Sequence, residues 1–223
     1  MGVSKIFLLF ILIVSASTKN VVLIGDSRTV GIAVYLMGFD YTTKTAYYGN
    51  GSNIVGLTPR IYGSYSVKAI CETGASYNTF TSKAILSSGV HSALAGSSAG
   101  TIVLMWLGVN GLNSEGTFNY YKSLATKYSK LKFYAISITG VDASKSNISN
   151  NSIKTFNTDL SKNIKNAGLS NLKYKSILYN NDPTKIGTNK VSLAISSSTT
   201  DVYGLHYFTS GYKIIFDTMV SGI

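Results

Sequence analysis

Residues 21–28 read Val-Val-Leu-Ile-Gly-Asp-Ser-Arg, a run of apolar side chains that ends at a Gly-Asp-Ser turn. A short apolar run closed by glycine is typical of a strand buried on both faces, as in a parallel sheet. The pattern over residues 28–37 is helical, so Ser27 lies at a strand-to-helix junction. Ligands of open α/β sheets bind at the carboxyl ends of the strands. We therefore expect Ser27 at a functional edge.

The same alternation of strand, turn and helix recurs along the chain. Apolar runs predict strands at 21–24, 67–71, 101–107, 132–138 and 174–178, and helical patterns predict helices at 28–37, 79–87, 116–130, 149–167 and 209–221. Gly168 follows the fourth helix and predicts its end, since glycine favours the left-handed conformation there. Regular alternation of this kind indicates an α/β fold in three layers with a five-stranded parallel sheet.

One segment, residues 39–66, interrupts the alternation between the first helix and the second strand. It is rich in Gly, Tyr, Ser and Asn, and a connection of this length is usually functional or disordered. Its tyrosines could stack on sugar rings or roof a cleft near the active-site side. Equally, the segment could be a partly folded surface insertion, and the sequence leaves both interpretations open.

Length and composition favour one globular domain. The chain has 223 residues and is 45% hydrophobic, which supplies one buried core. Lys and Arg number 20 against 9 Asp and Glu, giving a net charge of +11. This excess indicates either an anionic partner or a compositional bias, because the lysines are scattered. No nucleic-acid motif or basic helix is present, so nucleic acid is not an expected partner.

Cysteine and histidine are scarce, which limits the chemistry. One cysteine and 2 histidines cannot build a His/Cys metal cluster or an internal disulfide. Cys71 lies within an apolar run and is expected to be a small buried residue. We therefore expect neither a metal site nor a catalytic thiol.

The N-terminal segment predicts a secretory signal. Residues 1–5 carry one lysine, residues 6–14 are nine consecutive apolar residues, and residues 15–17 are small. This order is typical of a signal peptide at 1–17, leaving a single domain at 18–223 in a secreted or extracytoplasmic protein. Nine apolar residues are too few to span a bilayer. Retention as an anchor stays an alternative, because more apolar residues follow from Val21.

Four polar fragments follow strands or precede the last helix. They are Gly-Asp-Ser at 25–27, Gly74 after the second strand, Gly-Val-Asn at 108–110 after the third, and Gly-Leu-His at 204–206. Each fragment alone is weak, but their order places all four at one edge of the sheet. Together they supply a nucleophile, backbone N–H donors, an amide donor and a base, which is the inventory for acyl transfer.

These fragments resemble the SGNH hydrolases, also called the GDSL esterase/lipase family, over nearly all of the chain from Val21. Ser27, Gly74, Asn110 and His206 fall on the four residues that name the family. The resemblance implies a flavodoxin-like sheet and hydrolysis of ester bonds, often acetyl groups on carbohydrates or acyl groups on lipids. It implies that Ser27 is the nucleophile and His206 the base. The N–H groups of Ser27 and Gly74 and the amide of Asn110 then form the oxyanion hole, with no cofactor.

The sequence departs from the family at the acid. The family places it three residues before the histidine, where this chain has Tyr203, whereas Asp201 lies five before. Three alternatives follow: Asp201 completes a triad through a longer loop, a backbone carbonyl orients a Ser-His pair, or catalysis has been lost. Asp26 is expected to brace the turn. Arg28 is expected to be either solvated or packed, or else a contact to an anionic substrate.

The expected function is a secreted serine esterase acting on acyl esters, with short-chain or acetyl groups favoured and a carbohydrate acceptor preferred. A lipase or acyltransferase of the same family is one alternative. A non-catalytic carbohydrate-binding descendant of the fold is the other. His91 precedes the third strand, at the opposite edge of the sheet from Ser27, so we expect it to be structural.

Overall fold

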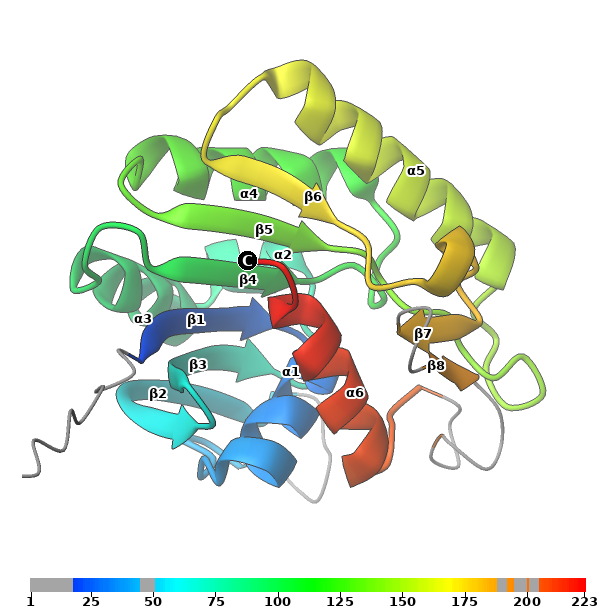
Figure 1. Cartoon of the computed structure of the whole chain (residues 1–223), viewed down its shortest axis with the longest axis horizontal. Coiled ribbons are helices and arrows are strands. Elements are labelled where there is room, and N and C mark those ends of the chain that lie inside the picture. The colour runs from blue at the N-terminus through cyan, green and yellow to red at the C-terminus, as the bar shows by residue number, and fades with distance from the viewer. Residues whose placement is uncertain (1–17, 45–50, 188–191, 195–199, 201–204) are drawn as a thin grey trace, which may run out of the picture.

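The fold is a twisted sheet between two layers of helices (Figure 1). It is seen in a computed structural model that describes residues 18–44, 51–187, 192–194, 200 and 205–223. The main sheet has six strands in the order β2-β3-β1-β4-β5-β6. They are β1 Lys19–Gly25, β2 Asn53–Tyr62, β3 Tyr65–Glu72, β4 Ile102–Trp106, β5 Lys132–Ile136 and β6 Leu172–Lys175. Five strands are parallel, as predicted, and β2 pairs antiparallel with β3. The flavodoxin-like three-layer α/β class is confirmed.

The helices divide between the two faces of the sheet. On one face lie α1 Ser27–Gly31, its π-helical continuation Ile32–Leu36, and α6 Thr209–Val220. On the other lie α2 Tyr77–Ser82, α3 Ala84–Ala95, α4 Ser114–Lys127 and α5 Asn150–Ala167. A short 3-10 turn at Tyr179–Asn181 leads to a small hairpin of β7 Lys185–Gly187 and β8 Ser192–Ala194. The predicted helix at 79–87 is wrong in extent, because two helices cover 77–82 and 84–95.

Alternate residues of the central strands serve separate cores. In β1, Val22 and Ile24 pack with α2–α5, while Val21 and Leu23 pack with α1 and α6. A strand covered on both faces needs apolar residues at every position, which explains its unbroken apolar run. Gly168 has φ +63° at the end of α5, as the sequence predicts.

The segment at 39–66 forms mainly an edge strand, which corrects the expectation of an insertion. Residues 53–62 are β2, joined to β3 by a two-residue turn at Gly63. Pro59 obscured the strand pattern, although proline is tolerated on an edge strand where its missing N–H faces no partner. Tyr62 and Tyr65 contact Phe216 edge-on at the start of β3, so they do not roof a cleft beside Ser27. Residues 45–50, including Tyr47 and Tyr48, lie outside the described part.

No helix of residues 18–44, 51–187 or 205–223 is long and apolar enough to cross a membrane. No group of three or more His, Cys, Asp or Glu side chains in the same described part could hold a metal ion. The predicted signal peptide, residues 1–17, lies outside the described residues.

Candidate active site

Ser27 is the first residue of α1, directly after β1. The turn is tight: a Cβ at Gly25 would lie 1.9 Å from the Thr29 hydroxyl and 2.7 Å from the Trp106 carbonyl oxygen. Asp26 caps the helix, its carboxylate accepting a hydrogen bond of 3.0 Å from the Arg28 N–H. The backbone N–H of Ser27 has no hydrogen-bond partner among the described residues. An unpaired N–H at a helix N-terminus suits a developing negative charge.

His206 is brought to Ser27 from the far end of the chain. Its Nε2 lies 2.8 Å from the Ser27 Oγ, which is hydrogen-bonding distance. Both residues are half-buried. Tyr207, the next residue, forms an antiparallel bridge with Thr200. The structure therefore brings together the predicted nucleophile and base, in the geometry by which an imidazole takes a hydroxyl proton.

Arg28 connects the Ser27 helix to the His206 loop. Its side chain is 0% exposed. Nε donates to the Leu205 carbonyl at 3.0 Å, Nη1 to the carbonyl and hydroxyl of Thr139 at 2.8 and 3.0 Å, and Nη2 to the Gly140 carbonyl at 3.0 Å. The packed interpretation of Arg28 is therefore the correct one. The guanidinium joins three segments far apart in sequence.

The residues on either side of His206 are both held by this cluster. Leu205 accepts the Arg28 hydrogen bond, and the Tyr207 ring lies 5.8 Å from the guanidinium. The Tyr207 hydroxyl is buried and donates to the Thr139 hydroxyl at 2.7 Å. The backbone that carries the imidazole is thus fixed on both sides. Sequence reasoning missed these partners, because nothing in residues 139–140 marks them as acceptors for an arginine.

Gly74 and Asn110 come from the loops after β3 and β4. The pairs Gly25–Cys71 and Gly25–Trp106 set the ends of these strands level with the end of β1. Gly74 has φ +75°, and its N–H has no hydrogen-bond partner among the described residues. Asn110 donates one amide hydrogen to the Ala75 carbonyl at 3.1 Å, which fixes its side chain beside the Gly74 turn. Its second amide hydrogen makes no hydrogen bond in the described part of the chain.

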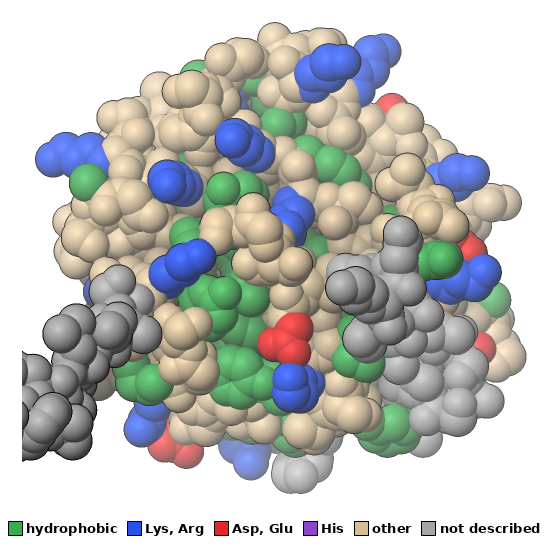
Figure 2. Space-filling view, viewed as in Figure 1, with side chains coloured by type: hydrophobic (Ala, Val, Ile, Leu, Met, Phe, Trp, Pro, Cys, Tyr) green, Lys and Arg blue, Asp and Glu red, His purple; other side chains and the backbone are tan. Residues whose placement is uncertain are grey.

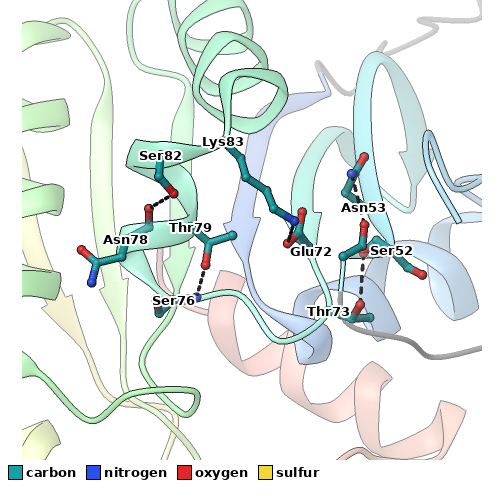
Figure 3. A network of polar contacts seen from close by, with 10 residues as sticks. Ser52, Asn53, Glu72, Thr73, Ser76, Asn78, Thr79, Ser82 and Lys83 are labelled. Atoms are coloured by element: carbon teal, nitrogen blue, oxygen red, sulfur yellow. Dashed lines mark hydrogen bonds and ion pairs between the residues drawn. The ribbon is translucent and has the colours of Figure 1, made fainter. Parts of the chain in front are cut away.

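Polar contacts hold the Gly74 turn from both sides (Figure 3). On one side, the Thr73 N–H and hydroxyl donate to the Ser52 carbonyl at 2.9 and 3.3 Å. On the other, the Ser76 N–H donates to the Thr79 hydroxyl at 3.0 Å, in a capping box that begins α2. The buried Glu72 carboxylate pairs with the Lys83 ammonium group at 2.6 Å. These contacts give Gly74 a fixed backbone without using its own N–H.

The remaining predicted residues have separate positions. Asp201 lies outside the described residues, so its partnership with His206 stays a prediction. His91 lies in α3, and its Nδ1 is 2.8 Å from the hydroxyl of Tyr128, at the end of α4. Burial lowers the His91 pKa, with the Lys127 charge adding to this effect. Cys71 is buried, and burial raises its thiol pKa well above the ordinary value, which leaves it unreactive.

The likeness of this chain to known proteins is found in its fold and not in its sequence. No family model matches the sequence, and no curated protein matches it. A Streptococcus pneumonia protein named as a platelet activating factor has a TM-score of 0.61 at 14% identity, over 92% of this chain and 84% of that chain. A Slackia heliotrinireducens protein assigned to the SGNH hydrolases superposes with a TM-score of 0.52 at 11% identity, over 91% of this chain and 97% of that chain. The chain has the fold of the SGNH hydrolases. An acetyl-xylooligosaccharide esterase variant from Geobacillus Stearmophilus gives 0.54 at 11% identity, over 93% and 96%.

The raised pKa of Asp26 predicts that the free energy of unfolding depends on pH. Burial raises its pKa from 3.8 to about 6, against the opposing effects of the Arg28 charge and the Arg28 N–H. Between these two values the folded protein keeps a proton that the unfolded chain releases, so ionisation of Asp26 lowers the free energy of unfolding as the pH rises. Asp26→Asn keeps the capping oxygen but cannot ionise. Relative to the unaltered protein, the variant should gain up to about 3 kcal/mol between about pH 4 and pH 7. Urea unfolding of both proteins measures this difference, and a difference independent of pH would contradict it.

The hydrogen bonds of the buried Arg28 guanidinium predict that even the conservative change Arg28→Lys lowers the stability of the protein. Lysine keeps the charge but cannot present a planar fork to Leu205, Thr139 and Gly140 together. Buried acceptors left unpaired cost about 1–3 kcal/mol, so Arg28→Lys should lower the free energy of unfolding by that amount. Arg60→Lys, at an exposed position of β2, is the control and should change little. Equal unfolding midpoints for the two variants would show that the fork is not needed.

Proposed function

We propose that this protein is a serine hydrolase of carboxylic esters. The observation that supports this most is the 2.8 Å contact between Ser27 Oγ and His206 Nε2, made by residues 179 positions apart. A binding module needs no such contact. Gly74 and Asn110, exposed on the loops after the two strands that neighbour β1, supply donors of the kind that acyl transfer requires.

The proposed reaction proceeds through an acyl-enzyme. Ser27 Oγ attacks the ester carbonyl while His206 Nε2 takes its proton, and the oxyanion that forms is stabilised by the N–H groups of Ser27 and Gly74 and the Asn110 amide. The tetrahedral intermediate then expels the alcohol, which receives its proton from His206. His206 next takes a proton from water, and the hydroxide released attacks the acyl-enzyme. The Ser27 oxygen recovers its proton from His206 as the acid leaves.

Asp201 is the proposed partner of the His206 imidazole. It is the chain neighbour of Thr200, and His206 is the chain neighbour of Tyr207. The bridge between Thr200 and Tyr207 therefore joins the chain neighbours of the two residues. An aspartate at this position would hold the imidazole in the tautomer whose Nε2 accepts the Ser27 proton.

The proposed substrate carries a short acyl group, with a carbohydrate acceptor preferred over a lipid. The fold neighbour named as an acetyl-xylooligosaccharide esterase motivates the acetyl group, and its identity of 11% makes this an analogy of fold. Export is also proposed, on the signal-like pattern of residues 1–17.

The central experiment removes the nucleophile. Ser27→Ala should lower kcat for p-nitrophenyl acetate by at least about 10,000-fold, because the acyl-enzyme cannot form. Ser88→Ala, at an exposed serine of α3, should leave kcat unchanged. A fluorophosphonate probe should label Ser27 in the unaltered protein, mapped by mass spectrometry. Labelling of a different serine in active protein would overturn the assignment. In the same assay, a kcat/KM that rises steadily with acyl length would replace the acetyl proposal with the lipase alternative.

The acid is tested separately. Asp201→Asn should lower kcat by at least about 100-fold, since asparagine favours the wrong imidazole tautomer. Asp217→Asn, at an exposed aspartate of α6 paired with Lys213, is the matched control. Urea unfolding checks that both variants remain folded. If Asp201→Asn keeps most of its activity while His206→Ala loses it, the enzyme uses a Ser-His pair.

A further inference from the structure

The edge of the sheet opposite the Ser27 site carries a row of tyrosines and lysines on one face. The antiparallel pair Tyr62–Tyr65 and the parallel pair Tyr65–Lys19 begin this row. Val21 lies on the same face of β1 as Lys19 and pairs with Ile102 of β4, which in turn pairs with Lys132 of β5. Lys132 therefore belongs to the same row. Paired residues of neighbouring strands point to the same side of a sheet. The row therefore lies on the face of α1 and α6, at the amino ends of the strands.

Beyond Lys132, none of the described helices lies over this face. Strands β5 and β6 have no helix in front of them in Figure 1, whereas α6 lies over the neighbouring strands. Tyr134 pairs with Lys173, which places Lys132, Tyr134 and Lys173 on this open face. Both lysines are exposed, and Tyr134 is half-buried. In the space-filling view of this side, lysine and arginine side chains gather over these strands with an apolar area bordering them (Figure 2).

The charges of this face are not neutralised within the described residues. No acidic side chain of that part forms an ion pair with Lys132 or Lys173. Lys19 and Lys175 donate to the oxygens of Ile223 and Ser221, so we do not count them as free charges. Between Lys19 and Lys132 lies a hollow of about 270 Å³, also lined by Asn20, Ser98 and Thr101. Ile223, whose oxygen accepts from Lys19, also lines this hollow, so Lys132 is the ammonium group left to a ligand there. Together with the hydroxyls of Ser98 and Thr101 and the amide of Asn20, it is suited to a phosphate group.

We propose that this face docks on an anionic lipid surface, with a phosphate headgroup in the hollow. Lysines attract anionic lipids, and tyrosines prefer the level of the headgroups, where one end of the ring is apolar and the other wet. The open face combines Lys132 and Lys173 with the half-buried ring of Tyr134.

The beginning of the chain supports a lipid occupant over a soluble polymer. The apolar run of residues 6–14 ends five residues before Lys19, where β1 begins at this same edge. Where that segment is retained as an anchor, the membrane that holds it lies within reach of Lys19 and Lys132, because the segment precedes β1 by only a few residues.

The open face lies at the amino ends of the strands, whereas the Ser27 site lies at their carboxyl ends. Docking through the amino ends would therefore direct the Ser27 site away from the membrane. Six residue steps along β1 separate Lys19 from Gly25, a rise of roughly 20 Å. The Ser27–His206 pair at the far edge would then face material outside the bilayer. This consequence rests on the proposed esterase activity, and it favours an envelope or soluble ester as substrate over a lipid of the docked membrane.

Vesicle sedimentation of the full chain tests the docking. Vesicles of phosphatidylcholine mixed with phosphatidylglycerol should bind the protein more tightly than phosphatidylcholine alone, and salt should weaken the difference. The double variant Lys132→Gln/Lys173→Gln should reduce partition onto the mixed vesicles by about 10- to 30-fold, since each lysine near an anionic surface contributes about fivefold. Lys162→Gln/Lys165→Gln, exposed on α5 in the opposite layer, makes the same change of charge and should reduce binding far less.

The outcomes separate this proposal from the alternatives. Equal losses for the two double variants would overturn it, because net charge alone would then account for binding. Binding that is independent of phosphatidylglycerol would overturn it in favour of the apolar segment. Tighter binding to soluble polyphosphate than to the vesicles would assign the face to an anionic polymer. Ser27→Ala should keep full vesicle binding, and the Lys132/Lys173 variant should keep its activity on p-nitrophenyl acetate, so failure of either proposal is seen independently.

Discussion

The buried guanidinium of Arg28 is the constraint on which the candidate site depends. An arginine removed from water needs every donor paired, and here its partners are carbonyl and hydroxyl oxygens from the loop after β5 and the loop before α6. The residue follows Ser27 directly, so satisfying the arginine also sets where the serine lies relative to those loops. The 2.8 Å contact of His206 with Ser27 is made by the residue next to one of these acceptors. The hydrogen bonds that compensate for burying the Arg28 guanidinium therefore also position Ser27 relative to the His206 loop.

The same cluster explains the electrostatics around Ser27. Asp26 is buried at the turn, where desolvation favours its neutral form and the Arg28 charge favours its ionised form. Burial dominates, which leaves this carboxyl near the midpoint of its titration under mildly acidic conditions. Asp26 also caps the helix, so it braces the turn as the sequence led us to expect. Its carboxylate is held by the N–H of Arg28, which makes it a part of the support beneath Ser27.

The two edges of the sheet differ in chemistry because parallel strands run in one direction, so that all their carboxyl ends lie at one edge and all their amino ends at the other. Every turn that follows a parallel strand lies at the carboxyl edge, and this chain places its serine, glycine, asparagine and histidine there. The amino edge collects the residues with which the strands begin. In this chain those include Lys19, Tyr65 and Lys132, and the absence of a helix over β5 and β6 in Figure 1 leaves part of that face open. The Ser27–His206 pair and the basic residues therefore lie at opposite edges of one sheet.

The sequence by itself determined the layers of the fold and the residues that meet at its edge. Unbroken apolar runs such as 21–24 favour strands covered on both faces, and the strands of a parallel sheet end at one edge, so Ser27, Gly74, Asn110 and His206 could be placed together. The family resemblance supplied their proposed roles. The tertiary structure decided the rest, because it depended on contacts between distant segments. Neither Thr139 nor Gly140 shows from sequence that it accepts from Arg28, since a backbone carbonyl looks the same at every position. The edge strand β2 was not predicted because its residues show no regular strand pattern, and its hydrogen bonds to β3 stabilise it instead. Lys132 and Lys173, far apart in sequence, lie on one face only through the register of the sheet, which brings them to neighbouring positions in space.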